Sequence, residues 1–218
     1  MKTLIKIFNL NLIKYTCSFF LIFLAQSCIS QIVGREVAVN LNDWKAVKPA
    51  NQHFWTVTDS TITGGDGKLN IPTNTYLHSD KSYKDFELRC LFRISGDHDL
   101  GLINSGIQYR SVLEGGKIVG YQADIGKGYW GDIYDEHRRA KLIDGDLSVL
   151  KHLLNEDSWN SYIVRCKGDI HELYINGVKT SEYQEMDKDI PSEGVIAIQL
   201  HSGGNAKVEF KNITITEL

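Results

Sequence analysis

Runs in which apolar and polar residues alternate at every second position constrain this chain more than any other feature. In the segment 86–93, Phe86, Leu88 and Phe92 are each followed by a charged residue and Cys90 by a leucine. A period of two is typical of a β-strand that buries one face and exposes the other. Similar runs cover residues 103–110, 119–125, 160–167, 170–175, 194–201 and 207–217.

The segments between these runs contain turns and little helix. Asn176-Gly177, between two short alternating runs, is a strong signal for a tight β-hairpin. Only Asp146–Asn155 has leucines at helical spacing. Because no long helices connect the strands, a parallel α/β sheet is excluded. The pattern predicts an all-β fold in which two antiparallel sheets pack as a sandwich.

The first 28 residues have a different character. Lys2, Lys6 and Lys14 precede the first acidic residue, Glu36. They are followed by the apolar run Tyr15–Ala25, which is too short for a comfortable bilayer span. This composition indicates a signal peptide. Leu24-Ala25-Gln26-Ser27-Cys28 matches a bacterial lipobox, so residues 1–27 are predicted as the signal peptide, 28–43 as an N-terminal tether and 44–218 as the folded domain.

These assignments predict an exported protein, either periplasmic or an outer-membrane lipoprotein held by acyl chains on Cys28. Ordinary cleavage nearby, giving a free periplasmic protein, is the alternative. The formal net charge is −3 and becomes more negative without the signal lysines, which argues against nucleic acid as a partner. Cys90 and Cys166 lie in strand-like runs, where they could be paired or be two buried thiols; we favour buried thiols.

Asn, Gln, Arg, Asp and His residues lie on one face of each of three predicted strands. A solvated outer face is the simplest explanation, but such faces usually carry Lys, Glu, Thr and Ser. Planar amides and guanidinium groups instead suit vicinal hydroxyls and carbonyls. The residues are Asn104, Gln108 and Arg110 in the first run, Gln122 and Asp124 in the second, and Gln199 and His201 in the third.

The segment 128–139 adds aromatic and charged residues near these strands. Trp130 or Tyr134 could stack on the apolar C–H face of a sugar ring, although Trp130 could equally be a core residue. The chain lacks the metalloprotease, nucleotide-binding and serine-hydrolase motifs, and also the paired carboxylates of jelly-roll glucanases. A carbohydrate ligand is the partner that the remaining pattern favours.

Several blocks of the chain resemble the 3-keto-disaccharide hydrolase family, formerly a domain of unknown function. The resemblance extends from about Trp44 to Leu218 and implies a concanavalin- or laminin-G-like jelly roll. The matching blocks include GYQADIG and WGDIYDEHRR at residues 120–126 and 130–139. The most specific parts are NSGIQYR and the closing IAIQLH…VEFKNI, at residues 104–110 and 196–213.

The resemblance implies cleavage of glycosides whose C3 hydroxyl has been oxidised to a ketone. The ketone acidifies the C2 proton, so that a base can expel the C1 substituent by elimination, with or without later addition of water. Such a site needs a base, an enolate stabiliser and an acid for the leaving group. The candidates are His201 or Asp124 as base, Arg110 as stabiliser and Glu136 or Tyr134 as acid, with Asn104, Gln108, Gln122, Trp130, Tyr134, Arg138 and Gln199 binding substrate.

Two alternatives remain open from the sequence. A divalent cation held by Asp124 and His201 is compatible with the residue types, but no ligand spacing requires it. A non-catalytic carbohydrate-binding module of a glycan-uptake system is the competing function, because this fold often only binds. Many family members also carry an acidic residue where this chain has Gln122, which puts any role of that carboxylate in doubt.

Overall fold

The structure is a computed structural model that describes residues 34–218 except residues 59 and 157. The predicted signal peptide 1–27, the lipidated Cys28 and the start of the tether lie outside these residues, so export and lipid anchoring stay predictions. Within the described ranges, the helices are all too short or too polar to span a bilayer.

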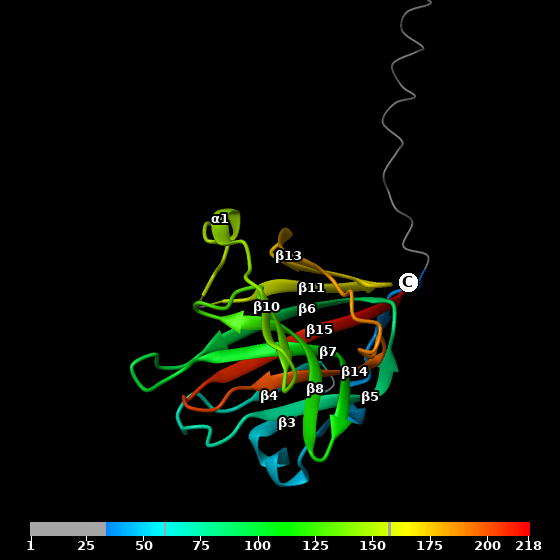
Figure 1. Ribbon diagram of the computed structural model, residues 1–218. Helices are drawn as coiled ribbons and strands as arrows, with labels where there is room; N and C mark the ends of the chain where they lie inside the picture. The colour runs from blue at the N-terminus through cyan, green and yellow to red at the C-terminus, as the bar shows by residue number, and fades with distance from the viewer. Residues whose placement is uncertain (1–33, 59, 157) are drawn as a thin grey trace, which may run out of the picture. The chain divides into compact units, whose positions relative to one another are not determined.

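Two antiparallel sheets make up the fold, which confirms the predicted all-β sandwich (Figure 1). In spatial order the first sheet contains β13 (Val178–Gln184), β12 (Ile170–Ile175), β11 (Asn160–Lys167), β6 (Phe86–Ser95), β15 (Lys207–Glu217), β4 (Thr61–Gly64) and β3 (Trp55–Val57), with β1 (Val37–Ala38) paired to β15. The second contains β10 (Ala140–Ile143), β9 (Ile133–Glu136), β8 (Lys117–Gly126), β7 (Asn104–Glu114), β14 (Gly194–Leu200), β5 (Thr75–Tyr83) and β2 (Lys45–Ala46). The short helical elements are η1 (Leu41–Asp43), η2 (Pro49–Phe54) and α1 (Leu147–Leu150).

The core lies between the two sheets and is built by the alternating residues. Phe92, Tyr162 and Phe210 of the first sheet are almost completely buried, and they belong to one cluster with Ile107 and Ile198 of the second. Each such side chain stabilises the fold by about 1.5–3 kcal/mol through its removal from water. The period-two pattern therefore predicted the correct buried face of these strands.

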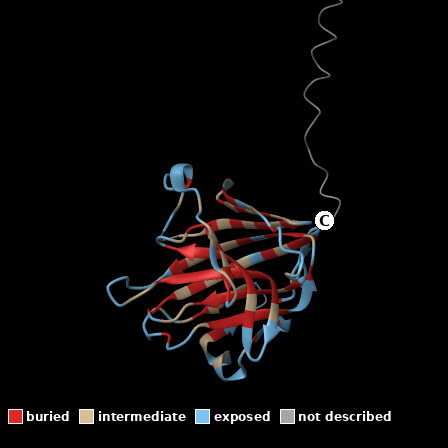
Figure 2. Ribbon diagram, viewed as in Figure 1, coloured by how far each residue is buried: buried red, intermediate tan, exposed pale blue. Residues whose placement is uncertain are grey.

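The central strands of the second sheet are buried on both faces. All residues from Asn104 to Ser111 in β7 and from Gly120 to Gly126 in β8 are buried, whereas β11 alternates between buried and half-buried positions (Figure 2). A solvated outer face would have left every second residue of β7 and β8 exposed. The polar residues of these strands are therefore enclosed.

A β-bulge interrupts the pairing of β7 with β8. Tyr109 pairs with Tyr121 and Val112 with Val119, so Arg110 and Ser111 together face Gly120. Arg110 takes a left-handed backbone conformation (φ 46°), which is uncommon for a residue with a side chain. A bulge inserts one residue and breaks the alternation of faces, so that the residues before and after it no longer share a side.

The predicted hairpin turn at Asn176-Gly177 is present in the structure, and the predicted helix is present in part. Asn176 and Gly177 both have positive φ (50° and 79°), as the predicted tight hairpin between β12 and β13 requires. The predicted helix is shorter than expected: α1 comprises four residues, begins after an Asp146 cap whose side chain accepts a hydrogen bond from the Ser148 amide, and projects from the sheets (Figure 1).

The folded part of the chain begins before residue 44, at which the sequence analysis starts the domain. β1 pairs with β15, through Val37 opposite Ile215, and Leu41 is buried in the core. The described end of the predicted tether therefore packs on the domain. Cys90 and Cys166 are both free and buried, as favoured from the sequence, and burial raises the pKa of each thiol to about 12.

The close packing at the bulge leads us to expect that a side chain at position 120 destabilises the fold. The φ of Gly120 is 153°, and an added Cβ would lie 2.7 Å from the Cα of Ser111. We expect Gly120→Ala to lower the free energy of unfolding in urea by about 2–3 kcal/mol. The matched control is Gly115→Ala at the tip of the same hairpin, where φ is also positive but the space is open; it should cost about 1 kcal/mol or less. Equal losses would contradict the steric role assigned to Gly120.

Candidate functional site

The candidate site lies on the outer face of the second sheet, where five predicted polar residues are almost inaccessible to water. Their exposed fractions are 0–4%, which rules out the solvated outer face as an explanation. Buried polar groups are retained only when they are hydrogen-bonded or serve a ligand. The five are Asn104, Gln108, Gln122, Asp124 and Gln199.

Gly106 of β7 lies at the centre of this face. It is paired with Asp124 on β8 and with Gln199 on β14. Adjacent strands are about 4.8 Å apart, so the backbones of Asp124 and Gln199 are about 10 Å apart with a residue lacking a side chain between them. The missing side chain leaves a space over Gly106, which the side chain of Gln122 occupies.

A cavity of about 260 Å³, the Asp124 cavity, opens on this face of the sheet. Its lining includes seven of the eleven residues selected from the sequence, contributed by four strands and the ends of adjacent loops. The predicted residues that line it are Asn104, Gln122, Asp124, Tyr134, Glu136, Gln199 and His201; the other lining residues are Asn74, Leu102 and Tyr129.

A chain of side-chain hydrogen bonds runs along one wall to Asp124. Ser111 donates to Gln108 Oε1 (3.2 Å), Gln108 Nε2 donates to Gln122 Oε1 (2.5 Å), and Gln122 Nε2 donates to Asp124 Oδ1. An added Cβ on Gly106 would lie 2.5 Å from Gln122 Cδ, so the glycine leaves the room in which Gln122 reaches Asp124. Gln108 does not line the cavity and instead orients Gln122 from behind.

The Asp124 carboxyl lies in a site that disfavours its ionised form. Burial raises its pKa to about 8, the Gln122 amide counteracts this, and the nearby carboxylates of Asp132 and Glu136 add to the increase. A buried carboxyl that titrates near neutrality, in a cavity, is a feature of catalytic sites.

The opposite wall is organised by Tyr76. Its hydroxyl donates to Glu136 Oε1 (2.8 Å) and accepts from Gln199 Nε2 (3.3 Å). Gln199 is 1% exposed, and its Oε1 has no hydrogen-bond donor among the residues described. A buried amide oxygen left in this state costs free energy, so it is suited to receive a hydroxyl group of a ligand.

His201 follows the end of β14 and is held by its own loop. Its Nδ1 lies 2.6 Å from the carbonyl oxygen of Ser202, so Nδ1 carries the proton. In the neutral ring Nε2 is then the unprotonated nitrogen and can act as a base. Asn74 fixes the loop, since its Oδ1 accepts from both the backbone and the hydroxyl of Ser202 (2.9 Å each).

Tyr134 completes the cavity from β9, next to Gln122 in the pairing of β8 with β9. Burial raises the pKa of its phenol above the ordinary value, and the carboxylates of Glu136 and Asp124 act in the same direction. Tyr134 therefore keeps its proton and presents a hydrogen-bond donor to the cavity.

The prediction that Arg110 shares this face is wrong. Because of the bulge, its side chain turns away from Asn104 and Gln108 and is buried, at 2% exposure, at one end of the sandwich. There it donates to the carbonyl oxygens of Lys84 (2.8 Å) and Gly168 (2.9 Å) and pairs with Asp85 at 3.0 Å. Arg110 therefore joins the two sheets and does not reach the Asp124 cavity.

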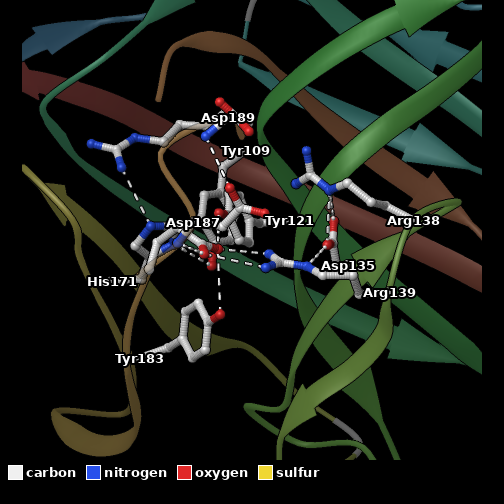
Figure 3. Close-up of polar contacts among 11 residues, drawn as sticks. Tyr109, Tyr121, Asp135, Arg138, Arg139, His171, Tyr183, Asp187 and Asp189 are labelled. Atoms are coloured by element: carbon white, nitrogen blue, oxygen red, sulfur yellow. Dashed lines mark hydrogen bonds and ion pairs between the residues drawn. The ribbon is translucent and has the colours of Figure 1, made fainter. Parts of the chain in front are cut away.

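The prediction that Arg138 binds substrate is also wrong. In the structure Arg138 lies in an ionic cluster near Arg110. Arg138 and Arg139 both pair with the buried carboxylate of Asp135, at 2.8 and 2.5 Å (Figure 3). Burial, followed by the charge of Arg110, lowers the pKa of the nearby His171 to about 3, so this histidine is neutral. The charges of the cluster are balanced and most of its hydrogen bonds are made, although Arg138 Nη2 has no partner among the described residues, so the cluster has mainly a structural role.

Trp130 is a core residue and not a platform for sugar. It is 6% exposed, and its ring centroid lies 6.3 Å from that of Phe92. Aromatic residues that do border the site, Tyr76 and Tyr129, were missed. Tyr76 precedes His78 in a short alternating segment that could have revealed it, whereas Asn74 lies in a loop without any pattern.

The described part of the chain contains no group of three His, Cys, Asp or Glu side chains close enough together to hold a metal ion. Asp124 and His201 do line one cavity, so the divalent cation considered from the sequence stays a prediction. The roles derived below do not depend on it.

Solved structures with the same architecture include carbohydrate-related proteins. A candidate glycosyl hydrolase from Parabacteroides distasonis superposes with a TM-score of 0.60 at 16% identity, over 84% of this chain and all of the other. The carbohydrate-binding module CBM66 from Bacillus subtilis gives 0.61 at 15% identity, over 82% of this chain and 98% of the other. A galectin-like protein from the same organism gives 0.60 at 9% identity, over 84% and 94%. The fold is thus the galectin- and concanavalin-like jelly roll.

The sequence itself defines the family. Residues 37–216 match the 3-keto-alpha-glucoside-1,2-lyase-like domain, and the chain belongs to this family. A search of curated proteins found no match to the chain. Family membership gives the domain a carbohydrate-related function, in agreement with the resemblance found in the sequence.

The raised pKa of Asp124 leads us to expect that the stability of the fold depends on pH. Between the ordinary aspartate pKa near 4 and the folded value of about 8, the folded state holds a proton that the unfolded state has lost, so stability falls as pH rises. We expect Asp124→Asn, which cannot ionise, to raise Tm by at least about 5 °C at pH 8 and to have little effect at pH 4. Equal shifts at both pH values, measured by calorimetry, would show that the carboxyl is not kept neutral by the fold.

Proposed function

We propose that the Asp124 cavity cleaves the glycosidic bond of 3-keto-glycosides, by elimination followed or not by addition of water. The observation that carries the proposal is the buried carboxyl of Asp124, with a pKa of about 8, in one cavity with the basic nitrogen of His201 and the phenol of Tyr134. Membership of the lyase-like family supports the substrate class.

The reaction needs a base and two donors. Removal of the C2 proton of a 3-keto-sugar gives an enolate whose negative charge lies on the C3 oxygen. When the ketone re-forms, the electron pair becomes the C1–C2 double bond and the C1–O bond breaks. The aglycone oxygen leaves with a proton from an acid, and water can then add at C1. No oxocarbenium ion forms, so two paired carboxylates are not required.

His201 is the base in this scheme. Its Nδ1–H group donates a hydrogen bond to the Ser202 carbonyl oxygen, so Nε2 is free to take the C2 proton. Of the two bases considered from the sequence, His201 fits better than Asp124, because the Asp124 carboxyl is largely protonated at pH 7.

Asp124 takes the role that the sequence analysis gave to Arg110. Its Oδ1 accepts from Gln122, so Oδ2 can carry the proton and donate it as a hydrogen bond to the C3 oxygen. A carboxylic acid kept neutral in a buried site can stabilise an enolate in this way. The amide chain from Gln108 orients the carboxyl before substrate binds.

Tyr134 is the donor to the leaving group. Its raised pKa keeps the phenol protonated, whereas Glu136 already accepts a hydrogen bond from Tyr76 and is arranged as an acceptor for sugar hydroxyls. Asn104 and Gln199 contribute further polar atoms to the cavity, and the free Oε1 of Gln199 receives a substrate hydroxyl.

The direct test uses a 3-keto-glucoside with a chromogenic aglycone and its unoxidised parent, each with and without chelator. We expect release from the keto form only. His201→Ala, Asp124→Asn and Tyr134→Phe should each lower kcat/KM at least about tenfold while circular dichroism stays unchanged. His152→Ala, in the exposed turn after α1, is the matched control and should retain full activity. Tight binding without release would instead favour the carbohydrate-binding module.

The pH dependence separates the two possible roles of Asp124. If its protonated form is required, kcat/KM falls as pH rises above about 8, and this alkaline limb disappears in the residual activity of Asp124→Asn. If Asp124 were the base, kcat/KM would rise through the same range. Stopped assays between pH 5 and pH 10 at constant ionic strength distinguish the two slopes.

A further inference from the structure

A second, smaller cavity of about 100 Å³ lies beside the Asp124 cavity. It is bordered by the segment that connects β2 to η2, the start of β5 and the tip of the β7–β8 hairpin. Its lining residues are Val47, Lys48, Asn51, Thr73, Asn74, Thr75, Tyr76, Gly116, Lys117 and His137.

The hydrogen bond between Tyr76 and Glu136 separates the two cavities. Tyr76 lines the smaller cavity, its partner Glu136 lines the larger one, and Asn74 lines both. A ligand bonded at the Asp124 cavity and extending past this pair therefore enters the smaller cavity. If the larger cavity holds the keto-sugar, the smaller one lies where part of the aglycone would be.

The cationic side chains at the smaller cavity distinguish it from the larger one. Lys48 and Lys117 line it, and no Asp or Glu does, whereas Asp124 and Glu136 line the Asp124 cavity. This is unexpected for a chain with a formal net charge of −3. The two cavities thus present opposite charges to the two parts of one ligand.

The nearby acidic groups do not neutralise these lysines. Among the described residues, neither Lys48 nor Lys117 appears in an ion pair within 4 Å, although Glu114 is the hairpin partner of Lys117. His137 lies 3.6 Å from Glu136 and donates from Nδ1 to the Ile118 carbonyl oxygen at 2.7 Å. An added Cβ on Gly116 would lie 3.9 Å from Lys48 Cε, so the Lys48 stem lies close to the hairpin tip.

The size of the cavity limits what can enter it. A volume of about 100 Å³ corresponds to about three water molecules, which is enough for a small substituent but not for a sugar ring with its hydroxyls. A carboxylate or a sulfate fits this volume and has the charge that two lysines attract.

We infer that the smaller cavity binds an anionic substituent on the aglycone, so that the preferred substrates are 3-keto-glycosides linked to an acidic sugar. This inference rests on the proposed function, because it assigns the smaller cavity to the leaving group. Carboxylate and sulfate share the chemistry that the lysines recognise.

The test compares three 3-keto-disaccharides that differ only in the aglycone: glucose, glucuronate and glucose 6-sulfate. At low ionic strength the protein should have a several-fold higher kcat/KM for the charged aglycones than for glucose. The double variant Lys48→Gln/Lys117→Gln should lower this preference about fivefold, and 0.5 M salt should do the same. Preference for one anion alone would identify its source as uronate or sulfate ester.

Lys167→Gln is the matched control, because Lys167 is exposed at the turn after β11 and lines neither cavity. Equal kcat/KM values for neutral and charged aglycones, or a preference that survives in the double variant, would overturn the inference. Absence of turnover with all three substrates would reject the proposed function instead. Calorimetric binding of the three unoxidised disaccharides would then decide the charge preference independently, since it requires no cleavage.

Discussion

The antiparallel pairing of β7 with β8 on one side and β14 on the other is the constraint on which the site depends. This pairing places Asp124 and Gln199 on either side of Gly106 and brings Gln108 next to Gln122. A shift of register by one residue would exchange the polar and apolar faces of β7 and destroy both the cavity and the core. The apolar residues that hold the register are therefore as necessary to the site as its polar residues.

The same strands carry a free-energy cost for the site that they form. A neutral carboxyl and an amide oxygen without a partner are both buried on the outer face, where a hydrophobic or solvated surface would be more stable. The ionic cluster around Arg110, Asp135 and Glu185 has the opposite character, since its charges are paired and its hydrogen bonds are largely made. One end of the sandwich is thus organised for stability, whereas the outer face keeps polar groups that cost stability.

Much of this could be read from the sequence, and the failures have identifiable physical causes. The limits of β11 and β12 follow from alternation, because each of these strands keeps one buried face along its length. In β15 the alternation is interrupted by a register shift after Lys211. Arg110 was misplaced because a bulge changes the face of a strand without changing its hydrophobic pattern, and the only local sign was Gly120 opposite. The short strands β9 and β10 have too few residues for a period to be visible.

Loop residues set a second limit on sequence reasoning. Asn74 and Tyr129 reach the cavity from connections, so their proximity is decided by how the chain folds back and not by any spacing in the sequence. Trp130 shows the reverse case, since an aromatic residue in a polar segment turned out to fill the core. Strand positions were therefore the more reliable guide to the site.

Gly106 has a consequence for how sites of this kind can change. Because position 106 has no side chain, the Gln122 amide occupies the space above it and reaches Asp124. A larger residue at position 106 would displace Gln122, so the centre of the site tolerates little variation. New ligand preferences are then expected at the rim, in the loops that carry Asn74, Tyr129 and the hairpin tip at Gly116. A fixed centre with a variable border would let one arrangement of polar groups accept many different glycans.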